Sequence, residues 1–293
     1  MALTGAGILW GTIGIVVRLL QDGGMTSTSI AFWRWGCAVL VLLPILGRAG
    51  LRSIRLQLRH PVRLSAVALS SLVFQLLYFF AVRDIGAGVA TLVTLGLAPV
   101  VLHLTDALAA RAVPPPWTLV VLTLALGGLA LVSVGHHDAQ VAPSPLLGLL
   151  EAVGSGLAYA ASTAWSRPLA TRLGPMPITF TSCALGLVLS LPVVAVTGWH
   201  VPRTAPTVGG IVWLGVVTTV IAYGLFYSGL RSTPGSTAMI VTLLEPVTAV
   251  ALAAWLLAEP LTMPNVLGGS LLLASVIALY VRPRPRAAPP PAV

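Results

Sequence analysis

"LLEPVTAVALAAWLLAEP" (Leu243–Pro260) is a long apolar run interrupted by a carboxylate and a proline side by side. Its Leu, Val, Ala and Trp residues suit the hydrocarbon core of a bilayer. Glu245 is costly in that environment unless a cavity or a partner receives it. Pro246 removes one helical hydrogen bond and leaves a carbonyl that only protein or water can satisfy. The stretch therefore predicts a membrane helix that borders a polar space.

The composition of the whole chain is typical of a membrane protein. Of its 293 residues, 57% are hydrophobic and 8% are charged, whereas soluble domains carry about 25% charged residues. Apolar runs of about 20 residues, long enough to span a bilayer as helices, recur along nearly the whole sequence. The runs are continuous and do not alternate, which argues against the strands of a membrane barrel. We predict an all-α integral membrane protein.

The apolar runs define ten candidate transmembrane helices. They lie at residues 2–20, 28–46, 62–82, 86–108, 117–135, 146–165, 176–197, 207–229, 235–257 and 264–282. We expect them to form a single transmembrane domain, residues 1–282, followed by a disordered Pro-rich tail at 283–293.

The distribution of the cations predicts the orientation of the chain. All sixteen are arginines. Twelve fall in the tail or in links on the side of the two termini, and only Arg83 and Arg203 fall on the opposite side. Arginine-rich links stay in the cytoplasm, so we expect a multi-pass inner-membrane protein with both termini cytoplasmic. This topology accounts for the net charge of +9, and we expect no nucleic-acid partner.

Two segments of the chain resemble each other. "GVATLVTLGLAPV" (Gly88–Val100) aligns without gaps with "GSTAMIVTLLEPV" (Gly235–Val247) at an offset of 147 residues. Each half, 1–136 and 146–282, then holds five helices. Because five is odd, the second half is expected to be inserted upside down relative to the first. Inverted repeats of this kind recur in secondary transporters.

Four stretches carry a likeness to a known family: "ILWGTIGIVVRLL", "IAFWRW", "LAPV" and "LLEPVTAVALAAWLLAEPLT". Through them the chain resembles the EamA-type members of the drug/metabolite transporter superfamily, over its whole length except the tail. It departs from them at "ALAARAVPPP", where members often have an acidic residue at the end of the fourth helix. The resemblance implies an inner-membrane carrier, often an exporter of amino acids, metabolites or drugs.

Glu245 is the first candidate for the solute site. It lies ten residues after Gly235, about 15 Å into its helix and near the midplane, where acids usually face a cavity. We expect it to bind an amino group of the solute or to carry a coupling proton. The alternative is a structural Glu paired with a neighbouring helix.

Pro99 and Pro246 occupy corresponding positions in the two halves. Paired interruptions of this kind indicate a central binding site in transporters built from repeats. We therefore expect both prolines to break or gate their helices beside one cavity. The alternative is a hinge that makes no contact with the solute.

Five aromatic residues and one arginine complete the predicted site. The aromatic residues are Trp10, Tyr78, Tyr159, Tyr223 and Tyr227. Their rings suit a planar or apolar solute, and packing between helices explains any one of them equally well. Arg34 stands between two tryptophans, a pattern typical of an interfacial belt with a snorkelling side chain. Alternatively, Arg34 pairs with an anionic group of the solute.

Small residues predict close helix contacts. Gly7 and Gly11 form a G-x-x-x-G pattern in the first helix, and Gly154, Ala158 and Ser162 keep the same spacing in the sixth. Such faces let helix backbones approach each other.

The sequence indicates neither a metal nor a cofactor, and no enzyme. His103 and Asp106 share a helix face, and His136, His137 and Asp138 cluster in a link, but neither set supplies a convincing set of metal ligands. Nucleotide-binding and hydrolase motifs are absent from the sequence, which leaves an integral-membrane enzyme as the weaker alternative. A second alternative, a carrier of lipid-linked or nucleotide-linked substrates, would need more cations in the cavity.

We expect the partners to be a small organic solute, the lipid bilayer and, as a candidate coupling ion, a proton, with the chain a monomer or dimer.

Overall fold

Helices form every regular element in the part of the chain that the structure describes. The computed structural model describes residues 1–57, 61–134, 144–256 and 260–281. Its helices are α1 (Ala2–Gly11), α2 (Ile13–Asp22), α3 (Ser27–Gln57), α4 (Pro61–Ile85), α5 (Ala87–Ala110), α6 (Pro116–Val134), α7 (Pro145–Leu173), α8 (Pro175–Thr197), α9 (Ala205–Val212), η1 (Trp213–Ile221), α10 (Ala222–Leu230), α11 (Gly235–Thr242), α12 (Leu244–Leu256) and α13 (Met263–Val281). The Pro-rich tail and the cluster of His136, His137 and Asp138 lie outside the described residues.

Ten helical stretches are long and apolar enough to cross a bilayer. They are Ala2–Asp22, Ser27–Arg48, Ser65–Ile85, Ala87–Ala110, Pro116–Val134, Pro145–Leu173, Pro175–Val196, Ala205–Leu230, Gly235–Leu256 and Met263–Val281. The predicted all-α membrane fold of ten helices is confirmed. The sixth span is longer than the prediction, which ended at residue 165, because the exposed turns with Arg167 and Arg172 continue the helix beyond the apolar run.

The first and ninth spans are interrupted near their middle. The first is divided into α1 and α2 at Thr12, whose hydroxyl donates to the carbonyl of Leu9 at 2.7 Å. The ninth is divided into α11 and α12 at Leu243, which has φ −65° and ψ 1°. Pro246 supplies no N–H to the carbonyl of Thr242, which removes one bond of the helical ladder at this point.

The eighth span contains π-helical turns. These turns, η1, join α9 to α10. Within them the hydroxyls of Thr218 and Thr219 both donate to the carbonyl of Leu214, each at 2.8 Å. π-Helical turns are often found at functional positions because they shift the register of the residues that follow. Tyr223 and Tyr227 of α10 lie just beyond this shift.

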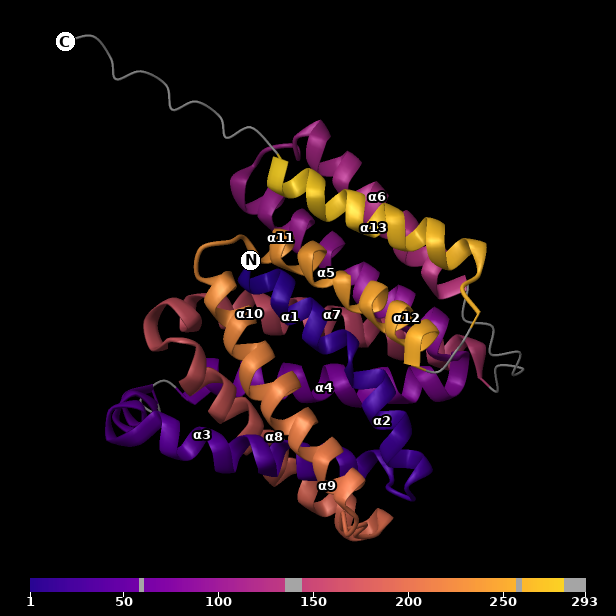
Figure 1. Ribbon diagram of the computed structural model, residues 1–293. Helices are drawn as coiled ribbons and strands as arrows, with labels where there is room; N and C mark the ends of the chain where they lie inside the picture. The colour runs from indigo at the N-terminus through magenta and orange to yellow at the C-terminus, as the bar shows by residue number, and fades with distance from the viewer. Residues whose placement is uncertain (58–60, 135–143, 257–259, 282–293) are drawn as a thin grey trace, which may run out of the picture.

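Figure 1 shows how the helices are grouped. Helices α6 and α13 run side by side along one edge, where a Cβ added to Gly128 would lie 2.7 Å from the carbonyl oxygen of Gly268. Helices α3 and α8 pack on each other at the opposite edge, and α4 packs along α7. The largest buried cluster lies between these edges, where α1, α5, α10 and α11 meet. The middle of the bundle is therefore where residues from both halves of the chain converge.

Candidate functional site at mid-depth

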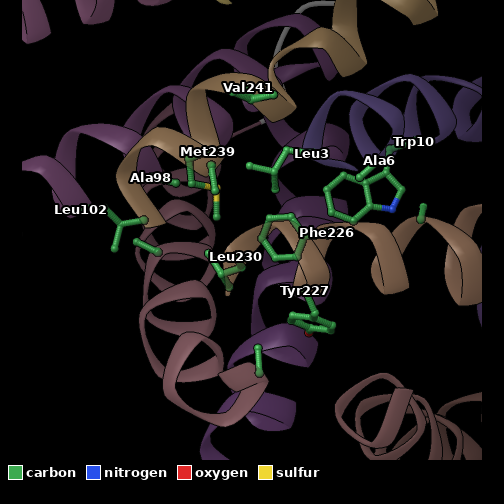
Figure 2. Close-up of a cluster of buried hydrophobic side chains, with 14 of the residues drawn as sticks. Leu3, Ala6, Trp10, Ala98, Leu102, Phe226, Tyr227, Leu230, Met239 and Val241 are labelled. Carbon is green, nitrogen blue, oxygen red and sulfur yellow. The ribbon is translucent and has the colours of Figure 1, made fainter. Parts of the chain in front are cut away.

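A buried apolar cluster fixes the helices around the candidate site. In Figure 2, Leu3 and Trp10 of α1 lie beside Phe226 of α10, with Met239 of α11 close by. Trp10 is 6% exposed, and its indole N–H donates to the carbonyl of Thr218 at 3.0 Å. Trp10 therefore holds α1 against the π-helical turns.

Glu245 occupies the middle of the ninth span, in the first turn of α12. It is half-buried, and among the described residues its carboxylate has no hydrogen-bond or ion-pair partner. Its carboxyl lies within electrostatic range of the phenols of Tyr78, Tyr159 and Tyr223. These tyrosines belong to α4, α7 and α10, which come from both halves of the chain.

Helix α1 lies directly against the interruption of the ninth span. A Cβ added to Gly7 would lie 3.3 Å from the carbonyl oxygen of Thr242, and one added to Gly11 would lie 2.7 Å from that of Glu245. Only glycine allows so close an approach between two helix backbones. The predicted close contact at this pair of glycines is confirmed, and it is made to the segment that carries the carboxylate.

Tyr78 and Tyr159 each contact a side chain of another helix. The Tyr159 ring stacks on Phe74 with centroids 4.6 Å apart. The Tyr78 hydroxyl lies 2.7 Å from that of Thr91 on α5. Neighbours on α4 and α5 therefore hold these two phenols.

Tyr223 and Tyr227 line a cavity between α3, α4, α8 and the eighth span. The cavity is lined by Trp35, Ala68, Ser71, Leu72, Gln75, Thr179, Ser182, Cys183, Gly186, Thr219, Tyr223 and Tyr227. Tyr223 contacts the edge of Trp10, with ring centroids 5.0 Å apart. Tyr227 is 2% exposed, and its ring centroid lies 5.9 Å from that of Tyr223. Glu245 does not line this cavity itself.

Arg34 points toward the cavity. Its Nη2 donates to Oε1 of Gln75 at 2.8 Å, and Gln75 lies at the centre of the third span. Its guanidinium carbon lies 5.7 Å from the centre of the Trp35 ring. Its Nε is buried and has no hydrogen-bond partner among the described residues. These contacts place the guanidinium at mid-depth, where a side chain that snorkelled to the interface would not lie.

The two prolines are buried, but their helices differ. Neither Pro99 nor Pro246 faces the lipid. Whereas the ninth span is interrupted, α5 continues without interruption through Pro99. Four residues on, the imidazole Nδ1 of His103 lies 2.8 Å from the Pro99 carbonyl oxygen.

His103 and Asp106 do not pair with each other. The Asp106 carboxylate accepts a hydrogen bond from Ser236 at 2.8 Å, which ties α5 to the start of α11. Among the described residues, no group of three or more metal-ligating side chains is present.

Sequence reasoning missed two residues that contact the predicted site residues. Gln75 accepts a hydrogen bond from Arg34, and Phe74 stacks on Tyr159. A signal existed for Gln75, because it is an amide in the middle of the apolar run "SLVFQLLYFF" and polar groups at that depth usually serve a function. The role of Phe74 depends on a contact between distant helices and left no local pattern.

Ten membrane-spanning helices around a polar mid-depth site define a multi-pass membrane protein of the transporter class. The chain belongs to the EamA-like transporter family, whose sequence profile matches residues 1–134 and 146–281. The predicted resemblance is thereby confirmed, and the chain is a membrane transporter.

Several relatives cover the whole chain. "Uncharacterized transporter YwfM" of Bacillus subtilis is 26% identical over an alignment that spans 95% of this chain and 92% of the relative. "Uncharacterized inner membrane transporter YicL" of Salmonella typhimurium is 27% identical, covering 96% of this chain and 95% of the relative. A solved crystal structure superposes with a TM-score of 0.80 at 17% identity, over 95% of this chain and 94% of the other. This last likeness shows the fold alone.

Proposed function

We propose that the protein is a secondary transporter that moves small organic solutes outward across the inner membrane by alternating access. Family membership supports transport, and a relative described as an inner membrane transporter supports the location. The single observation that carries the proposal is Glu245, a carboxylate at mid-depth that has no partner among the described residues.

A structural role for Glu245 would require a partner. Buried carboxylates that stabilise a fold are paired or hydrogen-bonded, because an isolated charge at the bilayer centre is costly. Glu245 has no such partner among the described residues, and the phenol of Tyr78, which lies within its electrostatic range, is hydrogen-bonded to Thr91. The carboxyl is therefore available to bind a cationic group of the solute or to take up and release a proton.

Contacts related by the offset between the halves support an inverted repeat and hence alternating access. On antiparallel α3 and α8, Gly186 contacts the ring of Trp35, where an added Cβ would lie 3.0 Å from the indole. Ala38 and Cys183, three residues further along α3 and three residues back along α8, belong to the same buried cluster. At an offset of 148 residues, Trp35 corresponds to Cys183 and Ala38 corresponds to Gly186, so the repeat exchanges the two pairs. A twofold axis through the α3–α8 interface would do the same. Transporters with such symmetry work by moving one bundle against the other around a fixed site.

A carrier of nucleotide-linked or lipid-linked substrates fits the site less well. Such substrates carry a diphosphate, which proteins bind with several cations or helix N-termini. In the described part of the chain, Arg34 is the one cation that contacts residues lining the cavity. One guanidinium cannot balance two phosphates.

Replacing the carboxylate tests the proposal. In cells that overexpress the protein, efflux of amino acids and related metabolites, and resistance to toxic amino-acid analogues, are measured for wild type, Glu245→Gln and Asp22→Asn. We expect Glu245→Gln to insert and fold, because Gln is nearly isosteric and removes the charge. Efflux should fall by at least about tenfold, or about 1.4 kcal/mol in the transport barrier. Asp22 is exposed at the end of α2, so its variant controls for the loss of a negative charge.

The dependence of efflux on pH separates two roles of Glu245. If Glu245 carries the proton, the residual transport of Glu245→Gln should lose its dependence on pH, because the other titratable groups that face it are phenols. Transport equal to wild type at every pH would show that Glu245 is structural. A complete absence of export by wild type for every solute would refute the carrier itself.

A further inference from the structure

We propose that the solute carries a carboxylate and that Arg34 is the subsite that binds it. This inference rests on the proposed function and names the class of solute that the same cavity takes. It also assigns Gln75 as the positioning residue that holds the guanidinium in place.

The first observation is a charge that has no counter-charge. A guanidinium cannot lose its proton in a protein, so Arg34 stays cationic at mid-depth. The described acids are engaged elsewhere or lie apart from it: Asp84 pairs with Arg83 at 2.7 Å and Asp106 accepts from Ser236. Glu245 forms no ion pair with it. Glu245 can become neutral by binding a proton, whereas Arg34 can be neutralised only by an anion.

The second observation is the orientation of the guanidinium. Gln75 accepts from Nη2, while Nε is buried and unpartnered. An unsatisfied buried N–H costs free energy until an acceptor reaches it. Nε–H and one N–H of Nη2 form the edge of a guanidinium that matches the two oxygens of a carboxylate. The Nε–H of this edge has no acceptor among the described residues, and a carboxylate oxygen would supply one.

The third observation is that Arg34 contacts the lining of the cavity. Gln75, which accepts a hydrogen bond from it, and Trp35, whose ring centre lies 5.7 Å from its guanidinium carbon, both line the cavity. Trp35, Tyr223 and Tyr227 give the same cavity aromatic walls. The site therefore combines one anion-binding group with an apolar surface, which suits an organic acid.

Charge balance selects a carboxylate over a phosphate. A carboxylate carries one negative charge and a phosphate monoester about −1.5 to −2 at neutral pH. Arg34 supplies one positive charge, and no second cation contacts the lining of the cavity among the described residues. A phosphate would leave excess charge at mid-depth, where charge is costly.

The test is thermal unfolding of the purified full-length protein in detergent. The probes are acetate and phenylacetate, with acetamide, phenylacetamide and phenyl phosphate as matched compounds, at constant ionic strength set with sodium chloride. For wild type we expect the carboxylates to raise Tm by about 2–4 °C at ten times their Kd, and the amides to leave it unchanged. An equal response to carboxylate and amide, or no response to either carboxylate, would overturn the subsite. A larger response to phenyl phosphate would overturn the choice of a carboxylate.

Three variants assign the response to Arg34. Arg34→Gln should lose the response and should be at least as stable as wild type without ligand, because it removes an uncompensated charge. Gln75→Glu supplies an internal carboxylate, so it should fold and also lose the response. Arg203→Gln removes an exposed arginine outside the site and should respond like wild type. A full response in Arg34→Gln refutes the proposal.

The two proposals fail in different ways. If carboxylates do not bind but Glu245→Gln abolishes efflux, the carrier stands and the subsite is wrong. If carboxylates bind through Arg34 but wild type exports nothing, the subsite stands and the carrier is wrong.

Discussion

The same helix contact occurs twice, each time between one half of the chain and the other, but only one of the two contacted spans is interrupted there. A Cβ added to Gly7 of α1 would lie 3.3 Å from the Thr242 carbonyl oxygen in the ninth span. A Cβ added to Gly156 of α7 would lie 2.9 Å from the Thr94 carbonyl oxygen in α5. The ninth span is interrupted at Leu243, whereas α5 is continuous. Since both contain a proline at the corresponding position, a proline alone does not interrupt this helix.

The neighbouring small residue differs between the two contacts. Gly11, one turn after Gly7, lets α1 approach the carbonyl of Glu245. Its counterpart, four residues after Gly156, is Ala160, which is buried. Glu245 itself corresponds to Ala98, which is fully buried. The carboxylate, the interruption and the extra glycine thus occur together at one of the two contacts, and the two contacts are not equivalent.

The largest expected effect is on the topology measured by reporter fusions. The two contacts are related by symmetry only if the two halves of the chain cross the membrane in opposite directions. Paired reporter fusions, one active in the cytoplasm and one in the periplasm, should give cytoplasmic signals at Gly47 and after Arg286. A fusion at Ala139 should give a periplasmic signal. The result is all-or-none at each site. A periplasmic signal at the C-terminus would mean that the halves are not inverted.

The next effect is on stability and comes from Gly11. In Gly11→Ala, the new methyl group would lie 2.5 Å from the Cβ of Thr248, so α1 must move away from α12. Overpacking of this kind costs about 1–3 kcal/mol, and Tm in detergent should fall. Gly14→Ala is the control, because no heavy atom lies within 4 Å of its added Cβ. If the two variants unfold at the same temperature, the close approach of α1 does not stabilise the bundle.

The sequence predicted the ten helices well because their signal is local. Apolar length alone places spans such as Pro116–Val134, and Glu245 stands out because an acid is rare at that depth. The direction in which Arg34 points could not be predicted in the same way. Two flanking tryptophans suggested the interface, and only Gln75, 41 residues away, draws the guanidinium inward.

The interruptions show the same limit of local patterns. Pro99 and Pro246 look equivalent in sequence, but only the ninth span is interrupted beside its proline. The position of the proline alone therefore does not predict the interruption. The π-helical turns before Tyr223 likewise have no proline or glycine pair that would have predicted them.

The smallest expected effect is the difference in efflux between variants of the two prolines. Pro99→Ala adds an N–H beneath the Leu95 carbonyl in a helix that is already continuous. One added hydrogen bond should stabilise the protein by about 1 kcal/mol and leave efflux within about twofold of wild type. Pro246→Ala offers the same bond to Thr242, but there it would close the interruption at Leu243 and move Glu245 away from its three tyrosines. Efflux should then fall more than in Pro99→Ala, and the amide of residue 246 should become protected from hydrogen exchange. Equal losses of efflux in the two variants would show that the prolines act as a symmetric pair, and that the asymmetry between α5 and the ninth span has no part in transport.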